Sequence, residues 1–109
     1  MLFRSAVKQQ FTSFEDAIAH SDTPILVDFY ATWCGPCQMM SKILEQVNID
    51  LNGQLRVMKI DTDKYPEIAS DHRIQALPTL VLFKGGQPVD RIEGVLQAAQ
   101  LIDRIGQFL

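Results

Sequence analysis

The sequence predicts an α/β domain with a central mixed β-sheet and helices on both faces. Apolar runs rich in β-branched and aromatic residues alternate along the chain with segments of helical periodicity, and two late runs are separated by a short glycine turn. These observations predict the element order β-α-β-α-β-α-β-β-α. With 109 residues, 47% of them hydrophobic, the chain has room for one core. We therefore expect a single domain over residues 1–109.

The N-terminal part is expected to form a strand and a helix. A short apolar stretch at residues 2–7 supplies the strand. Ser13 is the candidate N-cap of the helix, because Glu15 and Asp16 would then lie in the first turn, where the helix dipole favours negative charge. The residue before Pro24 is pushed out of helical geometry, so the element ends there.

The middle of the chain is expected to contain two strands with an amphipathic helix between them. Residues 25–31, ILVDFYA, form a near-continuous apolar run, which is typical of a strand covered on both faces. Residues 36–51 have apolar side chains at intervals of three and four, which predicts a helix that ends before Gly53. Residues 55–61, LRVMKID, alternate as a second strand does.

The C-terminal part is expected to add a short helix, a hairpin and a final helix. Residues 65–74 have Pro66 in the first helical turn, where a missing N–H has no cost. A buried strand at 79–83 and a partner strand at 89–94 are joined by a turn with two glycines. Residues 97–109 place their apolar side chains on one helical face.

Charge and hydropathy exclude two kinds of partner. The formal net charge is −3 without a run of Lys or Arg, so we expect no nucleic-acid partner. No apolar stretch approaches the roughly 18 residues of a membrane span, and no N-terminal segment has the pattern of a signal peptide. We therefore expect no membrane association and a cytoplasmic location, or an organelle matrix if a transit peptide has been removed.

Cys34 and Cys37 lie where a predicted strand ends and a helix begins. Three interpretations are open. The two could be inert core residues, since free cysteines are often buried. They could bind zinc, but a structural site needs about four ligands, and His20 and His72 lie in separate predicted helices. The third interpretation is a redox-active dithiol.

Spacing and position favour the redox-active dithiol. Residues three apart on a helix have Cβ atoms about 5–6 Å apart and a disulfide requires about 3.5–4.5 Å, so the bond closes a tight, readily reduced ring. Cys34 would lie at the helix N-terminus, where free N–H groups and the dipole stabilise a thiolate. Cys34 is therefore the predicted nucleophile, and Cys37, one turn inside, is the more shielded resolving thiol.

The sequence around the cysteines resembles the thioredoxin family. WCGPC at residues 33–37 matches that family's active-site motif, and the likeness continues through VMKIDTDKYPEIA, RIQALPTLVLFKGG and RIEG to the terminal helix. The resemblance implies the thioredoxin fold and a general protein-disulfide reductase. It also implies a monomer with no metal and no bound cofactor. Its electrons would come from a separate thioredoxin reductase, linked to NADPH or to ferredoxin, and its substrates would be disulfide-containing target proteins.

An aspartate inside the first apolar run needs its own explanation, because an unpaired carboxylate is costly to bury. Asp28 is either a strand-end residue that reaches solvent or, as the resemblance implies, the buried acid behind the active site. In the second case burial would raise its pKa and let it exchange a proton with Cys37. Lys59 matches the family's lysine on the neighbouring strand and is the candidate partner of Asp28; the alternative is a solvated strand residue.

Pro78 stands at the start of a predicted buried strand, where a missing N–H is unusual. The resemblance implies a cis peptide bond here, packed against the dithiol. It also implies that the backbone of Leu77 binds an extended substrate segment. Around Cys34 the family pattern implies a docking surface. This surface consists of Trp33, Gly35, Pro36, Ala76, Leu77, Pro78, Gly94 and Val95.

The sequence departs from the family pattern at four positions. Gln38 stands where many members have a basic residue, and Lys42 where they have a helix-kinking proline, so we expect a straighter helix. Gln75 replaces a residue that is often charged, and Tyr30 replaces a second tryptophan. The changes at Gln38, Lys42 and Gln75 leave the reaction centre whole and affect the choice of partner, whereas Tyr30 affects packing more than chemistry.

Two other functions stay open. An oxidase or isomerase on the same fold is disfavoured by Gly35 and Pro36, because more oxidising members of the family usually carry a histidine between the cysteines. A redox-regulated binding or adaptor subunit would have the same fold but no cysteine-dependent catalysis.

Overall fold

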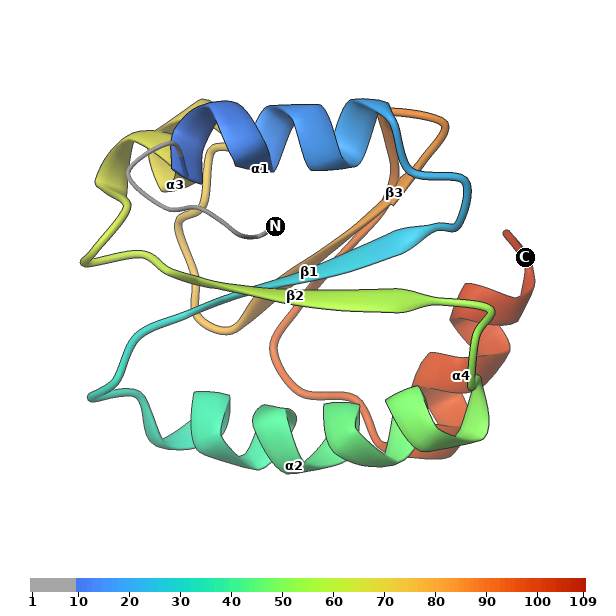
Figure 1. Ribbon diagram of the computed structural model, residues 1–109. Helices are drawn as coiled ribbons and strands as arrows, with labels where there is room; N and C mark the ends of the chain where they lie inside the picture. The colour runs from blue at the N-terminus through green and yellow to red at the C-terminus, as the bar shows by residue number, and fades with distance from the viewer. Residues whose placement is uncertain (1–9) are drawn as a thin grey trace.

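The computed structural model describes residues 10–109. The element bounds are α1 Gln10–Ala19, β1 Ile25–Tyr30, α2 Gly35–Asp50, β2 Arg56–Asp61, α3 Pro66–Asp71, β3 Thr79–Lys84, β4 Gln87–Glu93 and α4 Ala98–Gly106 (Figure 1). From the first helix onward, this order agrees with the predicted one. The predicted strand at residues 2–7 lies outside the described residues.

The strands form one mixed sheet in the order β2-β1-β3-β4. β1 is parallel to β2 and antiparallel to β3, while β3 and β4 form the predicted hairpin. Gly85 and Gly86 in the hairpin turn have φ of 60° and 81°, the left-handed region that glycine adopts without a side-chain clash. In the register of the sheet, Asp28 of β1 lies opposite Lys59 of β2 and Leu80 of β3.

Helices cover both faces of the sheet, as predicted. α1 and α3 lie on one face, and α2 and α4 lie on the other (Figure 1). Leu26 of β1 belongs to the core on the α2 and α4 side, whereas Val27 and Phe29 belong to the core on the α1 and α3 side. Because side chains alternate along a strand, Asp28 shares the α2 face with Leu26. The carboxyl group therefore faces the helix that carries the cysteines.

Two predictions about helices can be compared with the structure: the N-cap of α1 and the continuity of α2. α1 already includes Gln10, the first described residue, so Ser13 lies inside the helix and its prediction as the N-cap is wrong. The physical reason is that no Gly or Pro precedes Ser13 to prevent an earlier start. α2 runs for 16 residues through Lys42 without a break, as expected of a helix with no proline at that position.

Candidate functional site

Cys34 and Cys37 lie where β1 leads into α2. Cys34 is the N-cap of α2, with extended backbone at φ −89° and ψ 113°, and Pro36 lies in the first turn. The two cysteines form a disulfide with their Cα atoms 5.2 Å apart. This separation is within the range of ordinary disulfides, so a helix start accommodates the bond at this spacing.

Backbone geometry distinguishes the two sulfur atoms, whereas exposure does not. Cys34 and Cys37 are 5% and 4% exposed, so the prediction that Cys37 is the more shielded is not supported. The backbone N–H of Cys37 donates to Cys34 Sγ at 3.2 Å. A donor at a helix N-terminus stabilises negative charge, so the fold favours the thiolate form of Cys34.

Asp28 is fully buried on the α2 face and does not reach solvent. Among residues 10–109, neither of its carboxylate oxygens has a hydrogen-bond partner. Burial raises the pKa of Asp28 from 3.8 to about 6, and the positive charge of Lys59 opposes this rise. A carboxyl group with this pKa can take up or release a proton close to neutral pH.

Lys59 lies next to Asp28 in the strand register, but in the described part of the chain no ion pair joins them. Its Nζ donates to Ser41 Oγ at 2.7 Å and lies 4.8 Å from the centre of the Tyr30 ring. Lys59 therefore acts on Asp28 through its charge across a distance. Its exposed side chain also agrees in part with the alternative of a solvated strand residue.

An open groove lies beside the disulfide. It is lined by Trp33, Cys34, Gly35, Pro36, Thr62, Ile74, Gln75 and Leu77. Four residues of the predicted docking surface are therefore brought together here. Trp33 is 71% exposed, and its Nε1–H donates to Asp63 Oδ2 at 2.8 Å. A tryptophan held by such a bond presents a fixed apolar surface next to Cys34.

The other predicted docking residues lie outside the lining of this groove. The Leu77–Pro78 peptide bond is cis, as the resemblance implies, and Pro78 is buried. Leu77 packs against a small buried cluster that includes both cysteines. The N–H of Gly94 donates to the carbonyl oxygen of Pro78 at 2.9 Å, which holds Gly94 next to this segment. Ala76 is exposed, and Val95 packs against the core on the α2 and α4 side.

Sequence reasoning missed three polar residues of the site. Thr62 Oγ1 donates to the carbonyl oxygen of Tyr30 at 3.0 Å, Asp63 binds Trp33, and Ser41 binds Lys59 as described above. Because β1 and β2 are parallel, the residues that follow them meet at one edge of the sheet. That rule could have placed Thr62 and Asp63 at the site, whereas no pattern in the sequence indicated Ser41.

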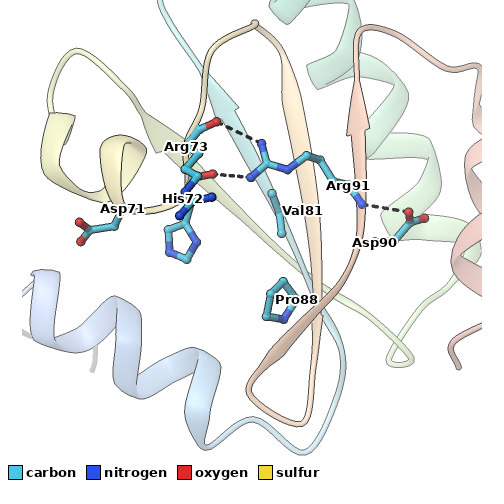
Figure 2. A pocket seen from close by; sticks show the side chains of 7 residues that line it. All are labelled: Asp71, His72, Arg73, Val81, Pro88, Asp90 and Arg91. Atoms are coloured by element: carbon cyan, nitrogen blue, oxygen red, sulfur yellow. Dashed lines mark hydrogen bonds between the residues drawn. The ribbon is translucent and has the colours of Figure 1, made fainter.

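A second pocket lies on the α1 and α3 face, away from the disulfide (Figure 2). His72 lines it, and the imidazole ring is 5.5 to 5.8 Å from the ring centres of three phenylalanines. The Arg91 side chain donates to the backbone carbonyls of His72 and Arg73, which connects β4 to the turn after α3. Within residues 10–109 no group of three or more His, Cys, Asp or Glu side chains is placed so that it could hold a metal ion.

Comparison with known proteins agrees with this geometry. The family model described as Thioredoxin matches residues 5–107. The chain belongs to the thioredoxin family. A thioredoxin-like protein of Synechocystis sp. is 64% identical over 104 residues, which cover 95% of this chain and 99% of that protein. The crystal structure of chloroplastic thioredoxin z matches with a TM-score of 0.81 at 46% identity, over 88% of this chain and 87% of the other.

Two further thioredoxin relatives are longer than this chain. Thioredoxin Y1, chloroplastic, of Arabidopsis thaliana is 59% identical over 104 residues, which are 95% of this chain but 60% of that protein. A bifunctional thioredoxin reductase/thioredoxin of Mycobacterium leprae is 46% identical over 90 residues, which are 83% of this chain and 20% of that protein.

In residues 10–109 no helix has the length and apolar character needed to cross a membrane.

These findings confirm the thioredoxin fold and the class of reaction. Thioredoxins are thiol–disulfide oxidoreductases, and this chain has the two cysteines of the family's active-site motif, joined as a disulfide at the start of α2. As a family, thioredoxins are reduced by thioredoxin reductase. The protein is therefore an oxidoreductase with a redox-active disulfide centre.

Proposed function

We propose that the protein is a general reductase of protein disulfides in which Cys34 attacks and Cys37 resolves. The observation that supports this most is the Cys37 N–H that points at Cys34 Sγ at the start of α2. The Cys34 thiolate attacks one sulfur of the target disulfide, and the other target sulfur leaves as a thiolate. Cys37 then attacks Cys34 Sγ and breaks the mixed disulfide. The target sulfur that was bound to Cys34 leaves as a thiolate. The dithiol supplies both electrons and becomes the Cys34–Cys37 disulfide.

Asp28 is proposed to move the Cys37 proton. Cys37 must lose its proton before it attacks Cys34, and the ionised Asp28 carboxylate on the same side of the sheet can accept it, directly or through a water molecule. The free acceptor capacity of its oxygens, among the described residues, and its pKa of about 6 support this role. When the disulfide is reduced again, the proton returns to Cys37.

Target proteins are proposed to dock around Cys34. The docking surface is the set Trp33, Gly35, Pro36, Ala76, Leu77, Pro78, Gly94 and Val95. The groove next to Cys34 and the exposed indole of Trp33 support the part of this surface that lies nearest the disulfide. An extended target segment would form main-chain hydrogen bonds with Leu77, as a short added strand.

The proposed electron donor is a separate thioredoxin reductase, linked to NADPH or to ferredoxin. The bifunctional relative of Mycobacterium leprae, whose name joins the two activities, supports a reductase as partner. We propose that the protein acts as a monomer without a bound cofactor or metal, because the two sulfurs carry the electrons. We also propose a cytoplasmic location; the chloroplastic relatives support an organelle matrix as the alternative.

Reduction of insulin by dithiothreitol tests the proposed function. The wild-type protein is expected to accelerate insulin precipitation, and Cys34→Ser is expected to match the rate without protein, because the nucleophile is lost. Cys37→Ser is the matched variant: it retains the nucleophile and should accumulate a mixed disulfide with the target. A redox-regulated adaptor would not accelerate the reaction in any form, and that result would contradict the proposal. The reduction potential against glutathione separates a reductase from an oxidase.

A further inference from the structure

Ser41 lies on α2 one turn beyond Cys37, and its hydroxyl accepts the hydrogen bond that Lys59 Nζ donates at 2.7 Å. Lys59 is an exposed residue on a flexible stem, and its ammonium group is strongly hydrated. Such a group has a defined position only where the protein binds it. Among the described residues it has two such contacts, the hydroxyl of Ser41 and the face of the Tyr30 ring.

We propose that Ser41 is a positioning residue for disulfide exchange, whose hydroxyl holds the Lys59 ammonium next to the strand position that carries Asp28. The inference rests on the proposed role of Asp28 as the group that moves the Cys37 proton. Ser41 has no direct part in the chemistry. It joins the helix that carries the cysteines to the strand that carries the charge acting on Asp28.

The physical argument is electrostatic. A fixed positive charge near a buried carboxyl group favours its ionised form. Of its two contacts in the described part of the chain, Lys59 without Ser41 keeps the one with Tyr30, and its side chain spends more time in solvent, where water screens its charge. The charge would then act on Asp28 less strongly. Loss of Ser41 should therefore reproduce part of the effect of removing the Lys59 charge.

Other titratable groups near Asp28 leave Lys59 as the charge that matters most. Tyr30 follows on β1 and Asp61 on β2, while α2 contributes Cys37, Lys42 and Glu45 to the groove that Lys59 also lines. From β3, the residue opposite Asp28 is Leu80, which carries no charge. Burial raises the pKa of Asp28, and the positive charge of Lys59 lowers it.

A carbon-13 NMR titration of the Asp28 carboxyl group tests the inference. The protein is kept in the disulfide form, so that neither thiol titrates in the same range. Lys59→Gln is expected to raise the titration midpoint by about 1 pH unit, and Ser41→Ala by about 0.5 unit. Ser41→Ala combined with Lys59→Gln should match Lys59→Gln alone. Ser41→Thr, which retains a hydroxyl, should restore the wild-type midpoint, and Ser70→Ala on α3 is the control for an exposed serine outside the site.

Two results would overturn the positioning of Lys59: a midpoint in Ser41→Ala equal to that of the wild type, or the same shift when Lys59 is already Gln. The pH profile of single-turnover reduction of a target disulfide is the second readout. It should move with the NMR midpoint. If the midpoint moves and the rate profile does not, Lys59 is held by Ser41 but Asp28 has no role in proton transfer, and the place of Ser41 in the reaction is refuted.

Discussion

Two side chains with buried polar atoms that lack a hydrogen bond within residues 10–109 lie on opposite faces of the same sheet. On the α2 face both oxygens of Asp28 have no hydrogen-bond partner among residues 10–109, and on the α1 and α3 face the same holds for His72 Nε2. The exposed fractions differ: Asp28 is 0% exposed, whereas the His72 side chain is 19% exposed. His72 Nε2 also lies within ion-pair distance of Glu15 Oε2, at 3.7 Å.

The surroundings of the two groups differ more than their burial. Asp28 lies on the side of the sheet that faces the disulfide helix, and one lysine charge acts on it. The His72 ring packs between Phe14, Phe29 and Phe83, as a further aromatic ring in that core. A buried polar atom without a hydrogen bond is thus informative about function when a reacting group lies near it, as for Asp28. His72 Nε2 has instead a nearby carboxylate, Glu15 Oε2 at 3.7 Å, and its ring is held by aromatic packing.

The largest expected effect is the pH-dependent contribution of Asp28 to the free energy of unfolding. The folded pKa of about 6 is above the unfolded value of 3.8, so the folded state binds the proton more tightly. This contribution to stability is present in acid and is lost as pH rises from 3.8 to about 6. The free energy of unfolding of the oxidised wild type should fall by about 2–3 kcal/mol from this group between pH 4 and pH 7.5. Asp28→Asn should lack that fall in urea unfolding at the two pH values.

The same variant links the stability effect to the reaction. In the reduced protein Asp28→Asn should slow the resolving step at neutral pH by at least about tenfold, because general acid–base catalysis is lost. Single-turnover reduction of a protein disulfide measures this step. An unchanged rate would remove Asp28 from the mechanism even if the change in stability is found.

The next effect concerns the His72 side. His72→Ala removes a ring that contacts three others and should lower the free energy of unfolding by about 2 kcal/mol. Insulin reduction, measured well below the unfolding temperature, should stay unchanged because the disulfide lies on the other face. His72→Phe is the matched variant, since it keeps an aromatic ring but loses the contact of Nε2 with Glu15, and it should regain most of the lost stability. Loss of reductase activity in His72→Phe would show that this pocket takes part in function.

The sequence predicts the placement of strands, helices and site residues better than it predicts individual side-chain contacts. Strand-to-helix alternation places Cys34 at a helix start, whereas the apolar run around Asp28 leaves open a strand-end residue that reaches solvent, and only the family resemblance implies the buried carboxyl group that the structure shows. The prediction of Ser13 as the N-cap of α1 is wrong because a serine has the chemistry of a cap residue, but no Gly or Pro precedes it to keep the helix from extending through it. The bond between Ser41 and Lys59 depends on how α2 is rotated over β2, which periodicity alone does not determine.

The smallest expected effect has the opposite pH dependence and comes from Asp90, which lines the His72 pocket (Figure 2). Its oxygens accept bonds from Arg104 Nε at 2.8 Å and from an Arg104 terminal nitrogen at 2.9 Å. These bonds lower the pKa of Asp90 below its ordinary value. The stabilisation is therefore present above an unfolded pKa near 3.8 and is lost as pH falls through the folded pKa. Asp28 and Asp90 thus respond to acid with opposite signs.

Arg104→Met removes the bonds to Asp90 together with a bond to the carbonyl oxygen of Arg91, and the pH dependence of its effect gives the Asp90 contribution. At pH 7 it should lower the free energy of unfolding by no more than about 1 kcal/mol, because half-exposed ion pairs are screened by water. The part of the difference that comes from Asp90 should shrink in about 1 M salt and should be lost as pH falls through the lowered pKa of Asp90. Urea unfolding at pH 7 and in acid measures the difference in the free energy of unfolding. Lys84→Met is the control for an exposed cation, on the hairpin that carries Asp90. A difference that persisted once Asp90 is protonated would come from the hydrogen bond that Arg104 donates to the carbonyl oxygen of Arg91, because that bond does not depend on the charge of Asp90.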